Sequence, residues 1–227
     1  YAESWSASSV ESYINWWGSD FDLIASILEE KGKRQPIWLN EIGYPTIRDK
    51  TELDQARFIR RAVVTLMATK QISLISWYEI KDLRQDTHLG VIGDSNNYHL
   101  GITYWDRTKK LGFHTLQDLV KELNDTPLTY MKDEIRFAEV DPGDPEPVVY
   151  LHAFRREEDG KLFLFAWLYG PYEEVKVNIE LPGDVREAIE HRLDGTLQTV
   201  DGIEGNELEA VRLVRDDARL FELTLKD

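Results

Sequence analysis

The chain has 227 residues, of which 42% are hydrophobic and 11% aromatic, as in globular proteins that form one large domain or two small ones. Its formal net charge of -15 and the lack of a Lys/Arg-rich run argue against nucleic acid and membrane surfaces as partners. The absence of cysteine excludes disulfides, thiolate zinc sites and a cysteine nucleophile, and leaves the compartment undetermined. No apolar run reaches the roughly 20 residues of a transmembrane helix. The first residue is Tyr1 rather than Met, which indicates a processed chain or a fragment.

The first half of the chain alternates helical and strand patterns. The predicted elements, in chain order, are a helix at 8–32 that breaks near Gly18, a strand at 36–41, a helix from Thr51 to about Lys70, a strand at 72–78, a long connection at 81–112 and a helix at 113–124. This order is typical of a parallel α/β architecture, although two strands cannot close a barrel.

The second half of the chain shows strand patterns rather than alternating helices and strands. A proline- and acid-rich run, "VDPGDPEP" at 140–147, indicates a linker. Short alternating strands are predicted beyond it, at "VVYLHAF", "KLFLFAWLY", "EVKVNIEL", "EAIEHRL" and "ARLFELTL". Together they predict an antiparallel β-sandwich.

One strand of the first half ends on a carboxylate. In "PIWLNEIGYPT", residues 36–46, Glu41 stands at the C-terminal end of the strand and Gly43-Tyr44-Pro45 form the turn. A solvated surface charge would explain Glu41, but functional groups of parallel α/β folds gather at this edge. Strand alternation places Trp77 and Glu79 on one face of the next strand, so we expect both near Glu41.

These segments resemble a known family. "PIWLNEIGYPT", "DQARFIRRAVVTLMA", "ISWYEIKDL", "HLGV" and "LGFHTLQDLVKEL" are similar to the C-terminal part of clan A glycoside hydrolases, the retaining (β/α)8-barrel enzymes, with families 39 and 5 the most similar. The resemblance implies an α/β plus all-β fold: the C-terminal portion of a TIM barrel over residues 1–127 and a β-sandwich domain over 128–227.

The resemblance also implies site residues. In the clan's seventh strand the nucleophile stands in a Glu, any residue, Gly, aromatic pattern, which Glu41 to Tyr44 match, and a Trp that lines the sugar subsite ends the eighth strand, where Trp77 stands. Tyr44, Trp77 and Glu79 are therefore substrate-binding candidates, and Tyr1 matches the clan's strand-six tyrosine. No metal or organic cofactor is implied.

A retaining glycosidase needs a second carboxyl group as its acid/base, about 5 Å from the nucleophile. The clan places that Glu on the fourth strand, which would precede this chain. We therefore expect an oligo- or polysaccharide substrate and, as a partner, the N-terminal half of the barrel, on the same gene product or another chain. Glu79 as a local acid/base is the weaker alternative.

Other candidates have simpler explanations. "TELD" at 51–54 resembles the nucleophile signature of xylanases, but a helix start explains its acidic residues. The histidines lack the spacing of metal ligands, although His88 and His99 lie in a loop that could border a cleft. Trp105, in the same loop, is a further sugar-binding candidate.

A second hypothesis for the whole chain is a non-catalytic carbohydrate- or protein-binding module with a degenerate barrel. The aromatic residues of "KLFLFAWLY" alternate, however, and predict a buried face rather than a sugar platform.

Overall fold

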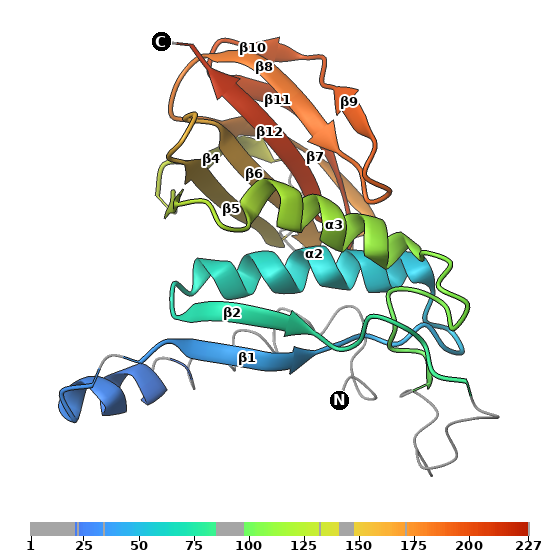
Figure 1. The fold of residues 1–227 in the computed structure, drawn as a ribbon. Helices are drawn as coiled ribbons and strands as arrows, with labels where there is room; N and C mark the ends of the chain where they lie inside the picture. Colours follow the sequence, from blue (N-terminus) through green and yellow to red (C-terminus); the bar gives the residue numbers. More distant parts are fainter. Residues whose placement is uncertain are drawn as a thin grey trace. The chain divides into compact units, whose positions relative to one another are not determined.

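The computed structural model describes residue 21 and residues 23–33, 35–84, 98–131, 133–140, 148–170 and 172–226. The chain folds into two compact units, Tyr1–Leu116 and Gln117–Asp227. The fold is a sheet-rich mixture of α and β, with few helices in the described part (Figure 1). None of the described helices is long and apolar enough to cross a membrane.

The first unit contains a parallel pair of strands, β1 (Ile37–Ile42) and β2 (Ile72–Trp77), joined through helix α2 (Glu52–Ala68) (Figure 1). The predicted parallel strand–helix–strand order is therefore confirmed. The hydroxyl oxygen of Thr51 accepts from the Asp54 backbone N–H at 3.2 Å, and the Asp54 carboxylate accepts from the Thr51 N–H at 2.8 Å. This capping box confirms that "TELD" is a helix start.

The helix before β1 ends as predicted at Gly32. Residues 23–30 are helical, and Gly32 has a φ of 63°, in the left-handed region that glycine adopts without strain. The Lys33 N–H donates to the Leu28 carbonyl at 2.9 Å across this turn. This bond spans five residues, as in the helix-terminating Schellman motif.

One face of the β1–β2 pair packs against α2. Ile42 and Tyr44 form a buried cluster with Phe58, Ala62 and Leu66 of that helix region, and Leu39, Ile72, Ile75 and Trp77 pack against it. Two paired residues lie outside this cluster: Trp38 is 64% exposed and its strand partner Leu74 is 41% exposed. The strand pair therefore has one face buried against α2, while the side chains of Trp38 and Leu74 are exposed to solvent.

The second unit begins within helix α3 (Leu111–Leu123) and consists mainly of antiparallel sheets. Its strands are β3 (Leu128–Tyr130), β4 (Arg136–Val140), β5 (Val148–Arg156), β6 (Leu162–Tyr169), β7 (Glu174–Glu180), β8 (Val185–His191), β9 (Leu197–Thr199), β10 (Ile203–Glu204), β11 (Glu207–Val214) and β12 (Arg219–Leu225). One sheet has the order β3-β5-β6-β12-β8-β9 and the other the order β10-β11-β7-β4.

Both sheets contribute to one hydrophobic core. Leu164 of β6 and Leu223 of β12 belong to the same cluster as Val177 of β7 and Leu213 of β11. β6 is buried along nearly its whole length, and Phe163, Phe165 and Trp167 are inaccessible to solvent. The prediction that this aromatic strand is buried is confirmed.

All five strands predicted in the second half are present as β5, β6, β7, β8 and β12. The sequence analysis did not identify β11, "ELEAVRLV", whose pairing with β7 shifts register between Leu208 and Val211. That irregularity places Glu209 and Ala210 together on the exposed side, so the strict apolar alternation is lost.

Candidate functional site

The C-terminal ends of β1 and β2 meet at one edge of the parallel pair. Ile42 and Trp77 are register partners, and the Tyr78 N–H donates to the Ile42 carbonyl at 2.8 Å. Both side chains belong to the cluster around Phe58, and the Trp77 ring meets the Phe58 ring edge-on at 6.1 Å. The Trp77 and Ile42 side chains are thus on the face that packs against α2.

Glu41 and Tyr78 are each one residue removed from that buried pair. Glu41 is exposed, and Tyr78 is partly exposed. Burial raises the pKa of Tyr78 above its ordinary value, and the negative charges of Glu79 and then Glu41 raise it further. Because charges act on a neighbouring group only at short range, both carboxylates lie near the Tyr78 phenol.

The pairing of β1 and β2 is irregular near Glu41. The register shifts between Leu39 and Ile42, and both of these residues pack on the same cluster. The Trp77 side chain packs on this cluster too, and the charge of Glu41 acts on Tyr78, the next residue along the chain. Among the described residues, the buried Trp77 indole N–H has no hydrogen-bond partner.

Gly43 is required by the close approach of the two strand ends. A Cβ atom at this position would lie 2.0 Å from the Tyr78 carbonyl oxygen and 3.1 Å from its carbonyl carbon. Tyr44 is 2% exposed and its ring packs 4.8 Å from that of Phe58, so it lies in the core of the unit. The glycine of the Glu-x-Gly-aromatic pattern is thus explained by the close approach of Tyr78, and the aromatic residue by its packing against Phe58.

Glu79 is held through its backbone. Its N–H donates to the Leu100 carbonyl at 3.3 Å, and its carbonyl accepts from the Ile102 N–H at 3.0 Å. The segment around residues 98–103 therefore runs alongside the end of β2. Tyr1 and His88 lie outside the described residues.

A cavity of about 420 Å³ opens among the loops that follow β1 and β2. Trp105 and His99 line it, together with Thr46, Lys50, Thr51, Glu52, Asp82, Leu83, Tyr98 and Tyr104. Trp105 is 54% exposed, and the Arg84 guanidinium carbon lies 4.9 Å from its ring centroid. His99 thus borders a cleft, as the sequence analysis suggested, and Asp82 is a lining residue to which the sequence assigned no definite role.

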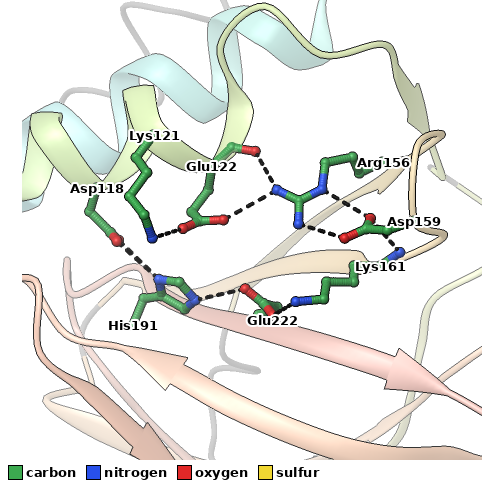
Figure 2. Close-up of polar contacts among 8 residues, drawn as sticks. All are labelled: Asp118, Lys121, Glu122, Arg156, Asp159, Lys161, His191 and Glu222. Carbon is green, nitrogen blue, oxygen red and sulfur yellow. Dashed lines mark hydrogen bonds and ion pairs between the residues drawn. The ribbon is translucent and has the colours of Figure 1, made fainter.

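A second group of charged side chains joins α3 to the strands of the second unit (Figure 2). His191 Nδ1 lies 3.0 Å from Asp118 Oδ1, and its Nε2 lies 3.3 Å from Glu222 Oε2, within ion-pair distance but outside hydrogen-bond geometry. Glu222 also pairs with Lys161. Sequence reasoning missed this group because Asp118 and His191 are 73 residues apart.

The same cluster contains three ligand atoms of the kind that metal sites use. Asp118, Glu122 and His191 bring one such atom each to within 4.8 Å of one another, and all three are buried. Glu122 is already engaged by Arg156 Nη1 at 3.2 Å and by Lys121 Nζ at 2.5 Å. A metal ion would have to displace these cations, so the arrangement is that of an ion-pair network.

No protein-family model matches the sequence, and no curated protein matches it. Several solved structures, however, are similar to this chain in fold. A family 39 glycoside hydrolase from the gut symbiont Bacteroides cellulosilyticus WH2 is similar with a TM-score of 0.63 and 16% identity, over 90% of this chain and 38% of that one. The thermostable GH51 α-L-arabinofuranosidase from Thermotoga petrophila RKU-1 has a TM-score of 0.57 and 13% identity, over 94% and 49%. The α-L-arabinofuranosidase from Thermotoga maritima has a TM-score of 0.54 and 14% identity, over 95% and 48%.

These structural neighbours are glycoside hydrolases, and the likeness at this level of identity is one of fold. The chain spans less than half the length of each of the three. The fold of the chain is therefore similar to that of part of these enzymes, as the resemblance of the sequence motifs led us to expect.

Proposed function

We propose that this chain is the C-terminal portion of a retaining glycoside hydrolase of clan A, a partial (β/α)8 barrel followed by a β-sandwich domain, with Glu41 as the nucleophile. The observation that carries the proposal is the placement of Glu41 at the C-terminal edge of a parallel strand pair, beside Tyr78 and Glu79. Catalytic groups of barrel enzymes occupy this edge.

In the proposed reaction the Glu41 carboxylate attacks the anomeric carbon, and the bond to the leaving-group oxygen breaks as that oxygen takes a proton from the acid/base. Water, which gives a proton back to the same acid/base, then attacks the anomeric carbon, and the bond to Glu41 breaks to release the sugar and the free carboxylate. On this proposal the Tyr78 hydroxyl donates a hydrogen bond to the reacting sugar.

The acid/base belongs to the part of the barrel that this chain does not supply. We infer that the N-terminal strands, from the same gene product or from a separate chain, complete the site and cover the exposed Trp38 and Leu74. On this proposal Glu79 binds the sugar rather than transferring the proton.

The proposal is tested by trapping the nucleophile. The chain, alone and together with its N-terminal barrel segment, is incubated with activated 2-fluoro-glycosides and digested for peptide mass mapping. A sugar adduct is expected on the peptide that contains Glu41, and only in the completed barrel. Glu41→Gln should abolish the adduct and lower turnover by about a thousandfold or more.

The control is Glu29→Gln, which changes an exposed glutamate in the same unit. It should leave both adduct and turnover unchanged. An adduct on another residue, or turnover retained by Glu41→Gln, would exclude Glu41 as the nucleophile. No adduct in the completed barrel with any sugar would favour a binding module with a degenerate barrel.

A further inference from the structure

A buried lysine lies where the loops after β1 and β2 meet. Lys110, the residue before α3, is inaccessible to solvent, although lysine side chains are almost never fully buried unless they are paired. Its Nζ atom lies 2.8 Å from one carboxylate oxygen of Asp82 and 2.7 Å from the other, and it donates to Thr46 Oγ1 at 2.7 Å. The same ammonium group lies over the ring of Tyr104, 5.0 Å from its centroid. Side chains of the first unit thus engage this cation on several sides.

Both hydrogen-bonding partners of Lys110 stand close in sequence to carboxylates of the proposed site. Thr46 lies five residues after Glu41, and Asp82 lies three residues after Glu79. Burial lowers the pKa of Lys110, while the hydrogen bond to Asp82 and, more weakly, the charge of Glu79 act against this lowering. Because charges act in this way only at short range, the ammonium group lies near the Glu79 carboxylate. Lys110 therefore joins the two segments that carry Glu41 and Glu79.

A third segment, residues 99–103, lies against both of these segments. The Thr46 N–H donates to the His99 carbonyl at 2.9 Å, and Asp82 Oδ1 accepts from the Gly101 N–H at 2.9 Å. A Cβ atom at Gly101 would lie 2.2 Å from the Asp82 backbone nitrogen, so only glycine fits there. These contacts place the partners of Lys110 within a closely packed backbone, in which a small displacement of one segment moves the next.

Stability alone does not explain an ion pair at this position. Burial lowers the pKa of Lys110 and raises that of Asp82, because both charges have been removed from water. Apolar side chains of similar volume are often as stabilising as a buried ion pair. Charge-assisted hydrogen bonds, however, have a preferred length and direction, which apolar contacts lack. The Lys110 contacts therefore add a defined geometry between Thr46 and Asp82.

We propose that Lys110 is a positioning residue of the proposed site. Its bond to Thr46 fixes the turn that follows Glu41, and its pair with Asp82 holds the end of β2 against that turn. Lys110 acts through these two partners and not on the substrate. Its importance for catalysis rests on the proposed glycosidase function, whereas its effect on the position of Glu41 is a property of the folded chain.

The first test measures whether Thr46 holds Glu41 near Tyr78. The whole chain is labelled with 3-fluorotyrosine, and Tyr78→Phe assigns one of the ten tyrosine 19F resonances. Glu41→Gln removes a charge that acts on Tyr78, and should therefore shift the Tyr78 resonance at neutral pH. In a Thr46→Val background this shift should fall to about half or less, because the turn has lost its bond to Lys110. Thr46→Ser retains the hydroxyl group and should preserve the shift.

The second test removes the ion pair without leaving a buried charge. In the double variant Lys110→Met, Asp82→Asn, the asparagine carbonyl still accepts from the Gly101 N–H. The Glu41-dependent shift of Tyr78 should again decrease, with little change in the midpoint of urea unfolding. In the completed barrel kcat should fall about ten- to a hundredfold, with KM changed less than about threefold, because misplacement acts on the transition state.

The matched control is Lys109→Met, which makes the same substitution at the exposed neighbouring lysine. It should change neither the fluorine shift nor kcat. A Tyr78 resonance that does not respond to Glu41→Gln would overturn the proposal. A response that is equal in the parent chain, Thr46→Val and the double variant, or one that is lost equally in Thr46→Ser, would also overturn it.

The catalytic part of the inference fails if the double variant retains the kcat of the parent. The glycosidase proposal fails in a different way. If no 2-fluoro-glycoside adduct forms on Glu41 in the completed parent barrel, Glu41 is not the nucleophile and Lys110 has no catalytic part to play. The fluorine shifts of the whole chain still decide whether Lys110 positions Glu41.

Discussion

His152 lies in a row of aromatic rings in the second unit. Its ring stacks on Trp167 with centroids 5.3 Å apart, and its Nδ1 lies 2.8 Å from the Tyr130 hydroxyl. Burial lowers the pKa of His152 from 6.5 to about 4. The folded protein therefore keeps this imidazole neutral at a pH where the unfolded chain protonates it.

The lowered pKa of His152 predicts that the protein becomes less stable as the pH falls. The folded state binds the proton less tightly than the unfolded chain, so stability is full above pH 6.5 and falls until about pH 4, by up to about 3 kcal/mol. His152→Phe keeps an aromatic ring and removes the titration. Urea unfolding followed between pH 7 and 4 should show a smaller decline in the variant; parallel declines would show that His152 does not titrate in this range.

At the scale of elements, ion pairs join α3 to the strands of the second unit. Arg156 of β5 donates to the Glu122 carboxylate at 3.2 Å and to the Glu122 carbonyl at 3.1 Å, and it forms a two-bond pair with Asp159 at 3.0 and 2.8 Å (Figure 2). Burial alone would raise the pKa of Glu122, but the hydrogen bonds from Lys121 and Arg156 lower it. These bonds thus outweigh the desolvation of Glu122.

Arg156→Met should destabilise the second unit by about 2–4 kcal/mol, because it leaves the buried Glu122 carboxylate without its guanidinium. Arg212→Met is the matched control. The pair that Arg212 forms with Glu174 is exposed, with side-chain exposures of 61% and 50%, so its loss should change the free energy of unfolding much less. Urea unfolding measures both, and equal effects would show that burial of the Arg156 network adds nothing.

At the scale of the whole molecule, the first unit has an incomplete sheet. In the described part, β1 and β2 pair only with each other, which leaves one edge of each strand unpaired. Trp38 and Leu74 are register partners and both are exposed, so they form an apolar patch on neighbouring strands. Exposed edges and apolar patches promote association with other chains.

The isolated chain is therefore expected to self-associate through this patch. The double variant Trp38→Ser, Leu74→Ser should weaken association about tenfold or more, as removal of two large apolar contacts predicts. Sedimentation velocity over a concentration series measures it. Val148→Ser, Leu197→Ser changes two exposed residues of the second unit and should have little effect. A chain that stays monomeric over the whole concentration series would show that the patch of Trp38 and Leu74 does not drive association.

Local sequence signals were sufficient for most elements. The Thr51 capping box, the left-handed Gly32 and the alternation of "KLFLFAWLY" act within a few residues, so helix starts, stops and strands could be predicted from them. Glu41 at a strand end was also predicted in this way. The irregular strand β11 was missed because its register shift depends on pairing with β7.

The sequence by itself determined the strand–helix–strand order, the all-β texture of the second half and the motif around Glu41, because these depend on local conformational preference and apolar periodicity. Only the tertiary structure decided that the Glu41 charge acts on Tyr78, that Asp82 and Trp105 line one cavity, and that Asp118 meets His191. The reason is physical: these placements follow from strand register and from contacts between residues distant in the chain, which no local pattern encodes.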